Sequence, residues 1–152
     1  MKKRVDLPEK KYEGYIFDLD GTLVDSMPLH YRAWREALAR AGAPDHVFRA
    51  DEFYSCGGKS ANDVVRFLNE RYGMHMDAAS TAADKRRIYL EMLEKEGMQP
   101  IREVVEFVHS LGDAPKAIAT GSAMPGASRT LAAAGLSGLF DVILTPDEVE
   151  HG

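Results

Sequence analysis

Apolar residues along the chain follow two spacings, one typical of strands and one typical of helices. Short, mostly apolar runs predict three strands, at residues 15–19, 116–120 and 140–145. Elsewhere apolar residues recur every three or four positions, which predicts amphipathic helices that end at glycines. These helices are expected to begin at or next to Pro28, Ser60, Thr81, Pro100 and Pro125. The segment 43–59 is rich in glycine and proline breaks and is predicted to be irregular.

The order of these elements predicts an α/β fold with a parallel sheet. A strand, a helix and a strand follow one another with short links in the second half of the chain, as in a parallel crossover unit. About ninety residues separate the first strand from the second, far more than one crossover needs. We therefore expect residues 27–97 to form an inserted helical domain, and residues 1–26 and 98–152 to form the sheet domain.

Two carboxylates close the first predicted strand. Asp18 and Asp20 are two positions apart, so the period of a strand places both on the same side of an extended backbone. Two like charges there raise each other's pKa unless a cation lies between them. Gly21 lets the chain turn sharply just afterwards. The pair indicates chemistry, whereas either aspartate alone would be interpreted as a residue that accepts hydrogen bonds from a turn.

Composition narrows the class of protein. The 152 residues are 45% hydrophobic and 28% charged, which is ordinary for a soluble globular protein. The net charge of −5 offers no basic surface for nucleic acid, and no apolar run approaches membrane-spanning length. The basic first residues lack the apolar core of a secretory signal. Cys56 is the single cysteine, which excludes an internal disulfide and agrees with a cytoplasmic location; we interpret it as a small, semi-buried hydrophobe.

The stretch YIFDLDGTLVDS, from Tyr15 to Ser26, resembles the first motif of the haloacid dehalogenase-like hydrolases. The resemblance implies their Rossmann-like parallel sheet with an inserted α-helical cap, as in the capped subfamily of β-phosphoglucomutase and sugar-phosphate phosphatases. It implies that Asp18 attacks phosphorus to form an aspartyl-phosphate, while Asp20 protonates the leaving oxygen and then activates water. It also implies Mg²⁺, held by the carboxylate of Asp18 and the backbone carbonyl of Asp20.

The identity of residue 20 bears on the substrate. A halide leaves without a proton, whereas an alkoxide needs one, so an aspartate at this position indicates phosphate esters over haloacids. The expected substrate is a small phosphorylated metabolite. Thr120 matches the family's second motif, where its hydroxyl and the N–H of Gly121 would bind a phosphate oxygen, with Ser122 beside them. A threonine at a strand end is also common for packing alone.

Three candidate residues in the inserted helices each have an ordinary alternative. Lys59 follows two glycines and corresponds to a basic residue of the substrate-reading cap loop in similar family members, or it lies in a solvated loop. His30 opens an H-x-x-A-W pattern that ends at Trp34, and it is either a neighbour of the active site or a helix-surface histidine. Lys85 precedes Tyr89 by one turn, where some relatives place a lysine that reaches the active site; the alternative is a solvated lysine.

The resemblance does not include the family's last two motifs. Relatives continue past residues equivalent to 148–152 into a Lys-Pro segment and an acidic strand, and we assign neither motif to Asp147, Glu148 or Glu150. Two functions therefore stay open: a Mg²⁺-dependent phosphatase or phosphomutase, and a truncated relative that binds phosphate weakly or serves as an assembly module. With three strands, the first strand becomes an edge whose exposed apolar surface favours self-association. The chain would then be a fragment, a truncated product, or a protein that completes its sheet with another copy.

Overall fold

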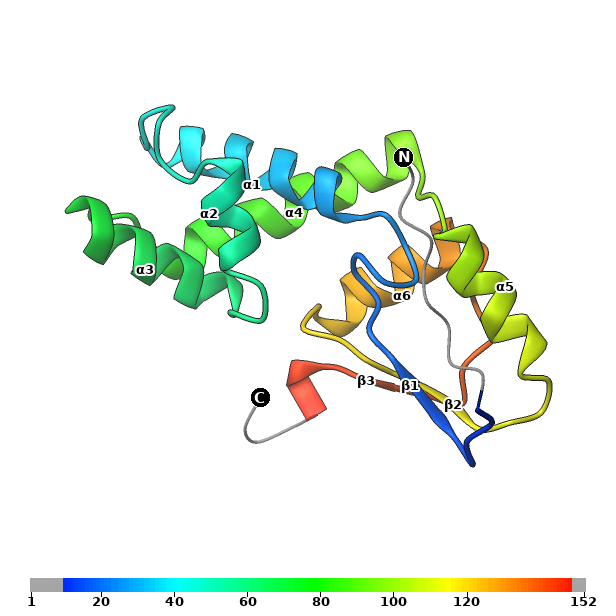
Figure 1. The fold of residues 1–152 in the computed structure, drawn as a ribbon. Helices are drawn as coiled ribbons and strands as arrows, with labels where there is room; N and C mark the ends of the chain where they lie inside the picture. The colour runs from blue at the N-terminus through cyan, green and yellow to red at the C-terminus, as the bar shows by residue number, and fades with distance from the viewer. Residues whose placement is uncertain (1–9, 149–152) are drawn as a thin grey trace. The chain divides into compact units, whose positions relative to one another are not determined.

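The computed structural model describes residues 10–148, which divide into two compact units. Residues 10–26 and 97–148 form the sheet unit, and Met27–Glu96 form the helical unit (Figure 1). Residues 1–9, and the acidic residue Glu150 near the other end, lie outside the described residues. Within the described part, no helix combines the length and apolar character needed to cross a bilayer.

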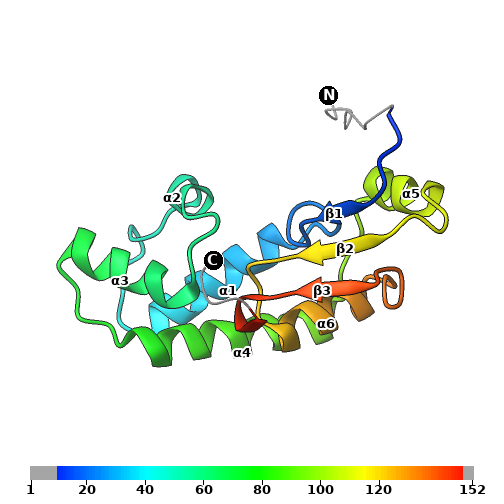
Figure 2. The same cartoon turned by 90° about the horizontal axis from the view of Figure 1, so that it is seen from below.

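The sheet unit contains three parallel strands in the order β1-β2-β3. They are β1 (Tyr15–Phe17), β2 (Lys116–Ala119) and β3 (Val142–Leu144), and Figure 2 shows them side by side with one direction. Phe17 pairs with Ile118, which in turn pairs with Ile143. The α/β fold with a parallel sheet is thus confirmed, and β1 is an edge strand as the three-strand prediction required.

Two helices, α5 (Arg102–Ser110) and α6 (Met124–Ala133), cover one face of the sheet, and a 3₁₀ turn, η1 (Pro146–Glu148), follows β3 (Figures 1 and 2). Phe17 and Ile118 are buried on the covered side. The alternate positions face the other way, so Ile16, Val142 and Leu144 are 75%, 49% and 43% exposed. The exposure of Ile16 confirms the prediction that the first strand is an edge with exposed apolar surface, since no helix of the described residues covers that face.

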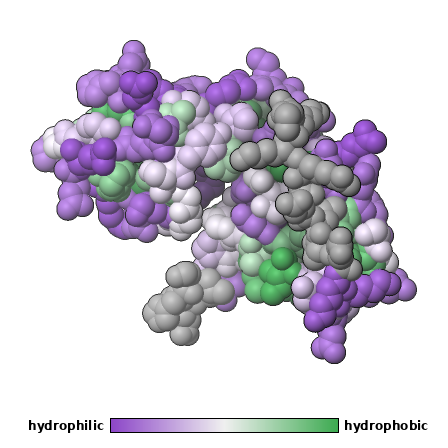
Figure 3. Space-filling view, in the orientation of Figure 1, coloured by the Kyte–Doolittle hydropathy of each residue, from purple (hydrophilic) through white to green (hydrophobic). Residues whose placement is uncertain are grey.

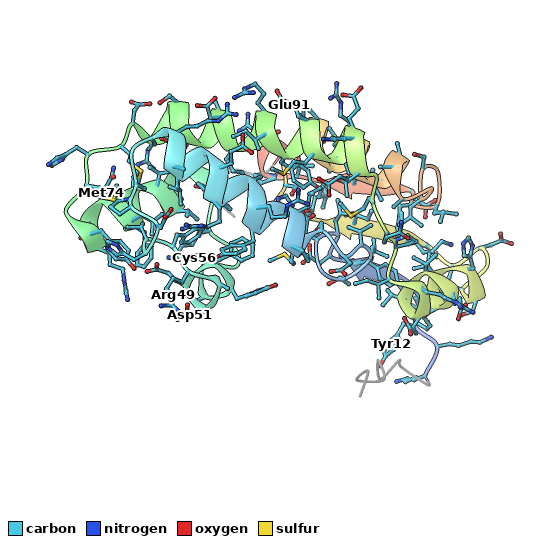
Figure 4. All side chains as sticks on the ribbon, turned by 90° about the horizontal axis from the view of Figure 1, so that it is seen from above. Tyr12, Arg49, Asp51, Cys56, Met74 and Glu91 are labelled. Carbon is cyan, nitrogen blue, oxygen red and sulfur yellow. The ribbon has the colours of Figure 1, made fainter. Side chains whose placement is uncertain are left out.

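The helical unit consists of α1 (Met27–Arg40), α2 (Ala50–Ser55), α3 (Ala61–Tyr72) and α4 (Ala78–Glu96). The helix α4 packs along both α1 and α3. Its neighbours enclose a core that includes Trp34, Phe48, Phe53 and Leu68, with Cys56 among them. Figure 4 shows Cys56 within the packed side chains and Glu91 on the outer side of α4. Burial raises the pKa of the Cys56 thiol, as expected of a packing residue.

Two helix boundaries differ from the sequence prediction. The segment predicted to be irregular contains α2, whose Phe53 is buried in the core. The helix α4 begins before Thr81, because Asp77 accepts a hydrogen bond of 2.7 Å from the N–H of Ser80, while Thr81 is a buried residue inside the helix. The predicted cap at Ser60 is confirmed, since its side chain accepts from the N–H of Asp63.

Candidate functional site

The aspartate motif forms a tight turn anchored by its own apolar residues. Leu19, Leu23 and Val24 are fully buried, and the N–H groups of Leu23 and Val24 both donate to the carbonyl of Leu19. Gly21 adopts a positive φ of 75°, which its lack of a side chain permits, and its N–H donates to the carbonyl of Val24. Because Leu19 points into the core, the alternation of the backbone turns Asp18 outward, and that residue is exposed.

Asp20 is held at both carboxylate oxygens. The hydroxyl of Ser26 donates to Oδ1 over 2.6 Å, and the hydroxyl of Ser122 donates to Oδ2, also over 2.6 Å. Ser26 belongs to the same turn and is completely buried. Ser122 lies 102 positions away and follows β2, so the second contact joins the carboxyl ends of β1 and β2. Short hydroxyl–carboxylate distances of this kind are typical of charge-assisted hydrogen bonds.

The phosphate-binding candidates lie at the end of β2. The N–H of Thr120 donates to the carbonyl of Leu144, and its Oγ1 accepts from the N–H of Ser122 over 3.1 Å. The residue between them, Gly121, is exposed, and a Cβ added there would meet no atom within 4 Å. The structure thus brings Thr120, Gly121 and Ser122 together with Asp20 beside a backbone that has open space next to it.

The carboxyl of Asp18 carries a raised pKa. Desolvation by neighbouring atoms is the main cause, and the charge of Asp20 adds to it, whereas a hydrogen bond of 2.7 Å from the N–H of Leu19 acts in the opposite direction. Among the described residues, no lysine or arginine forms an ion pair with Asp18. The turn therefore presents negative charge without a compensating cation at Asp18.

This donor set fits a hard divalent cation in part. Carboxylate and carbonyl oxygens are the ligands that Mg²⁺ prefers, and a cation beside Asp18 would relieve the repulsion from Asp20. Residues 10–148 contain no group of three or more His, Cys, Asp or Glu side chains arranged to hold a metal ion. If Mg²⁺ binds here, the carboxylate of Asp18 and the carbonyl of Asp20 would be its protein ligands among the described residues, and water and substrate oxygens would complete the coordination.

Two of the candidates in the helical unit contact each other. The Nζ of Lys85, on α4, lies 2.8 Å from Nδ1 of His30, on α1. The ring of His30 stacks on Tyr89 with a centroid distance of 4.0 Å. Lys59 is exposed, and its Nζ lies 5.7 Å from the ring centroid of Phe67 on α3. The structure thus pairs His30 with Lys85, whereas Lys59 contacts a different helix.

Sequence reasoning missed two residues that the fold places near the site. Ser26 was seen only as the end of the motif, although a serine directly after its last aspartate is a suitable donor to a carboxylate. Thr145 directly follows β3, in the same position that Thr120 occupies after β2. Thr145 is buried, and within the described residues its hydroxyl oxygen has no hydrogen-bond partner. For Thr145, a threonine directly after an apolar strand was the available signal.

The fold and the aspartate turn define a Rossmann-like α/β protein with paired acids at the carboxyl end of its first strand. The family profile of the haloacid dehalogenase-like hydrolases matches residues 15–152, and the chain belongs to this family. It is 31% identical to the fructose-1-phosphate phosphatase YqaB of Escherichia coli over 93% of this chain and 73% of that protein. It is 32% identical to hexitol phosphatase A of the same organism, over 92% of this chain and 62% of that one.

Solved structures show the same fold. A hydrolase from Pseudomonas syringae superposes with a TM-score of 0.77 at 26% identity, over 91% of this chain and 64% of that chain. CbbY from Rhodobacter sphaeroides, solved in complex with phosphate, gives a TM-score of 0.75 at 22% identity, over 91% of this chain and 65% of that chain. The chain therefore spans roughly two thirds of the length of these relatives.

Proposed function

We propose that this chain catalyses phosphoryl transfer from a small phosphorylated metabolite, most simply the hydrolysis of a sugar phosphate. The observation that carries the proposal is the exposed carboxyl of Asp18 two residues before Asp20, whose carboxylate is held by hydroxyls from both β1 and β2 ends. The names of the two Escherichia coli relatives, a fructose-1-phosphate phosphatase and a hexitol phosphatase, support a sugar phosphate as the substrate class.

The proposed reaction has two steps. In the first, a carboxylate oxygen of Asp18 attacks phosphorus, the bond from phosphorus to the sugar oxygen breaks, and protonated Asp20 gives its proton to that oxygen. In the second, the carboxylate of Asp20 takes a proton from water, whose oxygen attacks phosphorus. The bond between Asp18 and phosphorus then breaks, so that inorganic phosphate leaves and both acids return to their starting states.

The remaining candidates would bind and orient the substrate. The hydroxyl of Thr120 accepts from Ser122, so its proton is available to a phosphate oxygen, and the N–H of Gly121 would donate to the same group. Asp18 and the carbonyl of Asp20 would hold Mg²⁺, which when bound supplies positive charge beside the phosphate and the two acids. We propose further that the helical unit serves as the cap, in which His30, Lys85 and Lys59 contact the substrate.

The test is phosphate release from a panel of sugar phosphates with and without Mg²⁺, for the wild type and for Asp18→Asn and Asp20→Asn. We expect Mg²⁺-dependent release by the wild type and a loss of at least about a thousandfold in Asp18→Asn. Asp113→Asn, an exposed loop residue, is the matched control. Activity that persists in Asp18→Asn would exclude this residue as the nucleophile. Transfer of phosphate to a second sugar in place of water would identify a mutase.

A second function is supported by a separate observation. The uncovered face of the sheet presents Ile16, Val142 and Leu144 to solvent, and a green patch lies over the strands in Figure 3. Parallel sheets are normally covered on both faces, so this face is suited to contact with another polypeptide. An assembly module that binds phosphate weakly is the alternative to the enzyme. Absence of turnover in the wild type, together with concentration-dependent association, would favour it.

A further inference from the structure

The hydroxyl of Ser122 is committed to Asp20. A serine hydroxyl has one proton to donate, and here the acceptor is Oδ2 of Asp20, 2.6 Å away. The same hydroxyl cannot then donate to a substrate phosphate, which is the role that the sequence predicted for Ser122. The hydroxyl of Ser122 therefore acts on the site through its hydrogen bond to Asp20.

A backbone turn presents this hydroxyl. Oγ1 of Thr120 accepts from the N–H of Ser122, two residues later, which closes a turn around Gly121. Thr120 is itself buried and fixed by the hydrogen bond from its N–H to the carbonyl of Leu144 on β3. A line of contacts thus runs from β3 through Thr120 and Ser122 to the carboxylate of Asp20.

Two contacts fix a carboxylate where one does not. The buried Ser26 hydroxyl holds Oδ1 from within the same turn. The second donor on Oδ2, which comes from a different strand, defines the plane of the carboxylate and selects one side-chain rotamer. A proton-transfer group needs such a fixed orientation, because small displacements from the productive geometry lower rates steeply.

We infer that Ser122 is a positioning residue that orients the carboxylate of Asp20 for proton transfer, and not a ligand of the substrate. The inference rests on the proposed function for its kinetic consequence, but the orientation itself is a property of the substrate-free protein. It separates Ser122 from Thr120 and Gly121, which keep the proposed role of phosphate ligands.

The experiment compares Ser122→Thr with Ser122→Val in the full chain, because these side chains have nearly the same shape and differ in the hydroxyl. The first readout is the χ1 rotamer of Asp20, measured from three-bond couplings by NMR without substrate or metal. We expect one rotamer in the wild type and in Ser122→Thr, and averaging over rotamers in Ser122→Val. Ser122→Ala provides a smaller deletion of the same hydroxyl if the valine does not fold.

The second readout is the kinetics of phosphate release. We expect kcat to fall about tenfold to a hundredfold in Ser122→Val and Ser122→Ala, to recover in Ser122→Thr, and KM to stay within about twofold. Ser128→Ala is the matched control, since this exposed serine on α6 bonds only to Met124 in the described residues.

The outcomes are distinguishable. A single Asp20 rotamer in Ser122→Val, or a rise in KM with kcat unchanged, overturns the inference, the latter because it identifies a substrate ligand. A wild type without turnover contradicts the proposed function, and in that case rotamer averaging in Ser122→Val but not in Ser122→Thr still supports the positioning of Asp20 by Ser122.

Discussion

The Nζ of Lys85 lies 2.8 Å from Nδ1 of His30. A lysine ammonium can only donate hydrogen bonds, so Nδ1 is the acceptor and the ring proton of a neutral His30 lies on Nε2. The ring stacks on Tyr89 with planes 6° apart, and the same ammonium lies 5.6 Å from the ring centroid of Trp34, within cation–π range. Residues from α1 and α4 thus fix the histidine in one orientation and one tautomer.

We predict that Lys85→Met removes the preference of His30 for the Nε2–H tautomer. The methionine keeps most of the apolar stem but removes the donor to Nδ1, so the Nδ1–H tautomer of His30 should become populated. Nitrogen-15 chemical shifts of the ring report the tautomer directly. Lys95→Met, an exposed position on the same helix, is the control. If the pair contacts substrate as proposed, KM should also rise about tenfold, the equivalent of one lost contact of ~1.4 kcal/mol. An unchanged ring spectrum in Lys85→Met would contradict the assignment.

The charge at Asp18 gives a stability prediction with a defined sign. Its pKa is raised in the folded protein, chiefly by desolvation, so ionisation of this carboxyl costs more in the folded than in the unfolded state. The cost is absent below the unfolded pKa, near 3.9, and complete above the folded one. We therefore expect metal-free Asp18→Asn to be more stable than the wild type at pH 7, by less than about 1 kcal/mol for so exposed a residue.

Urea unfolding measures this difference. The stability gain of Asp18→Asn should shrink as the pH falls toward 4, because the wild-type carboxyl then becomes neutral. Added Mg²⁺ should stabilise the wild type and leave Asp18→Asn unchanged, since a ligand that binds only the folded state raises its stability. Equal stabilisation of both proteins by Mg²⁺ would show that Asp18 is not a ligand.

A strained residue in the helical unit depends on Glu52. Phe48 is fully buried with a φ of +59°, a region that side chains other than glycine rarely adopt. Its N–H donates to Oε2 of Glu52 over 3.2 Å, and the hydroxyl of Tyr72 donates to the same oxygen over 2.9 Å. The other oxygen forms an ion pair of 2.8 Å with Nε of Arg71 that is not aligned as a hydrogen bond.

We predict that Glu52→Ala lowers the free energy of unfolding by about 2–3 kcal/mol, because two donors lose a charged acceptor and the strained backbone loses its support. Glu52→Gln should cost less, since its amide oxygen can still accept from one donor. Glu70→Ala, at an exposed position on α3, should stay within about 0.5 kcal/mol of the wild type. Chemical denaturation measures the free energy of unfolding of the three variants. If Glu70→Ala lowered it as much as Glu52→Ala, the loss would come from replacing a glutamate in a helix and not from the contacts of Glu52.

The parts of the fold that depend on neighbours in sequence were predictable. An apolar run followed by an acidic turn places β1 and the paired aspartates, because both features are local. The position of Phe48 could not be predicted, since its positive φ is maintained by Glu52 and by burial within the core. The short helix α2 was missed for the same reason, because Phe53 packs in the core of a segment whose composition favours a loop.

The candidate site likewise has some features that the sequence predicted and others that it could not predict. The sequence predicted that strand alternation places Asp18 and Asp20 on one side of the backbone, and the buried Leu19 between them agrees with that alternation. The contact between Ser122 and Asp20 joins residues 102 positions apart, and a parallel crossover brings strand ends together without specifying which hydroxyl meets which carboxylate. The proximity of His30 to Lys85 likewise depends on how α1 packs on α4, so sequence alone left each with two interpretations.

The cap of α3 offers a prediction in the loop that holds Lys59. Oγ of Ser60 accepts from the N–H of Asp63 over 3.2 Å and donates to its carboxylate over 2.6 Å. The pKa of Asp63 is lowered, first by this hydroxyl and then by Arg66. Ser60→Ala should cost about 1 kcal/mol of stability, while Ser60→Asn should retain most of it.

The carboxyl of Asp63 provides the second readout of the cap. Because its folded pKa is depressed, it stabilises the protein above the unfolded pKa, and this contribution disappears as the pH falls through the folded value. Loss of the Ser60 hydroxyl should therefore raise the pKa of Asp63 toward its ordinary value, which carbon-13 NMR titration of the carboxyl can follow. A titration unchanged in Ser60→Ala would show that Arg66 alone depresses the pKa.

The uncovered face of the sheet gives a prediction about assembly. Ile16, Val142 and Leu144 are exposed and alternate with the residues buried beneath α5 and α6, and an apolar face on a parallel sheet favours association. We expect the protein to sediment as dimers or larger species at micromolar concentration. Replacing the three residues by threonine, which suits strands, should shift it to monomer, whereas Tyr54→Ser, at an equally exposed apolar residue of the helical unit, should not. A wild type that stays monomeric at all concentrations, or a triple variant that associates as strongly, would rule out this face as the contact.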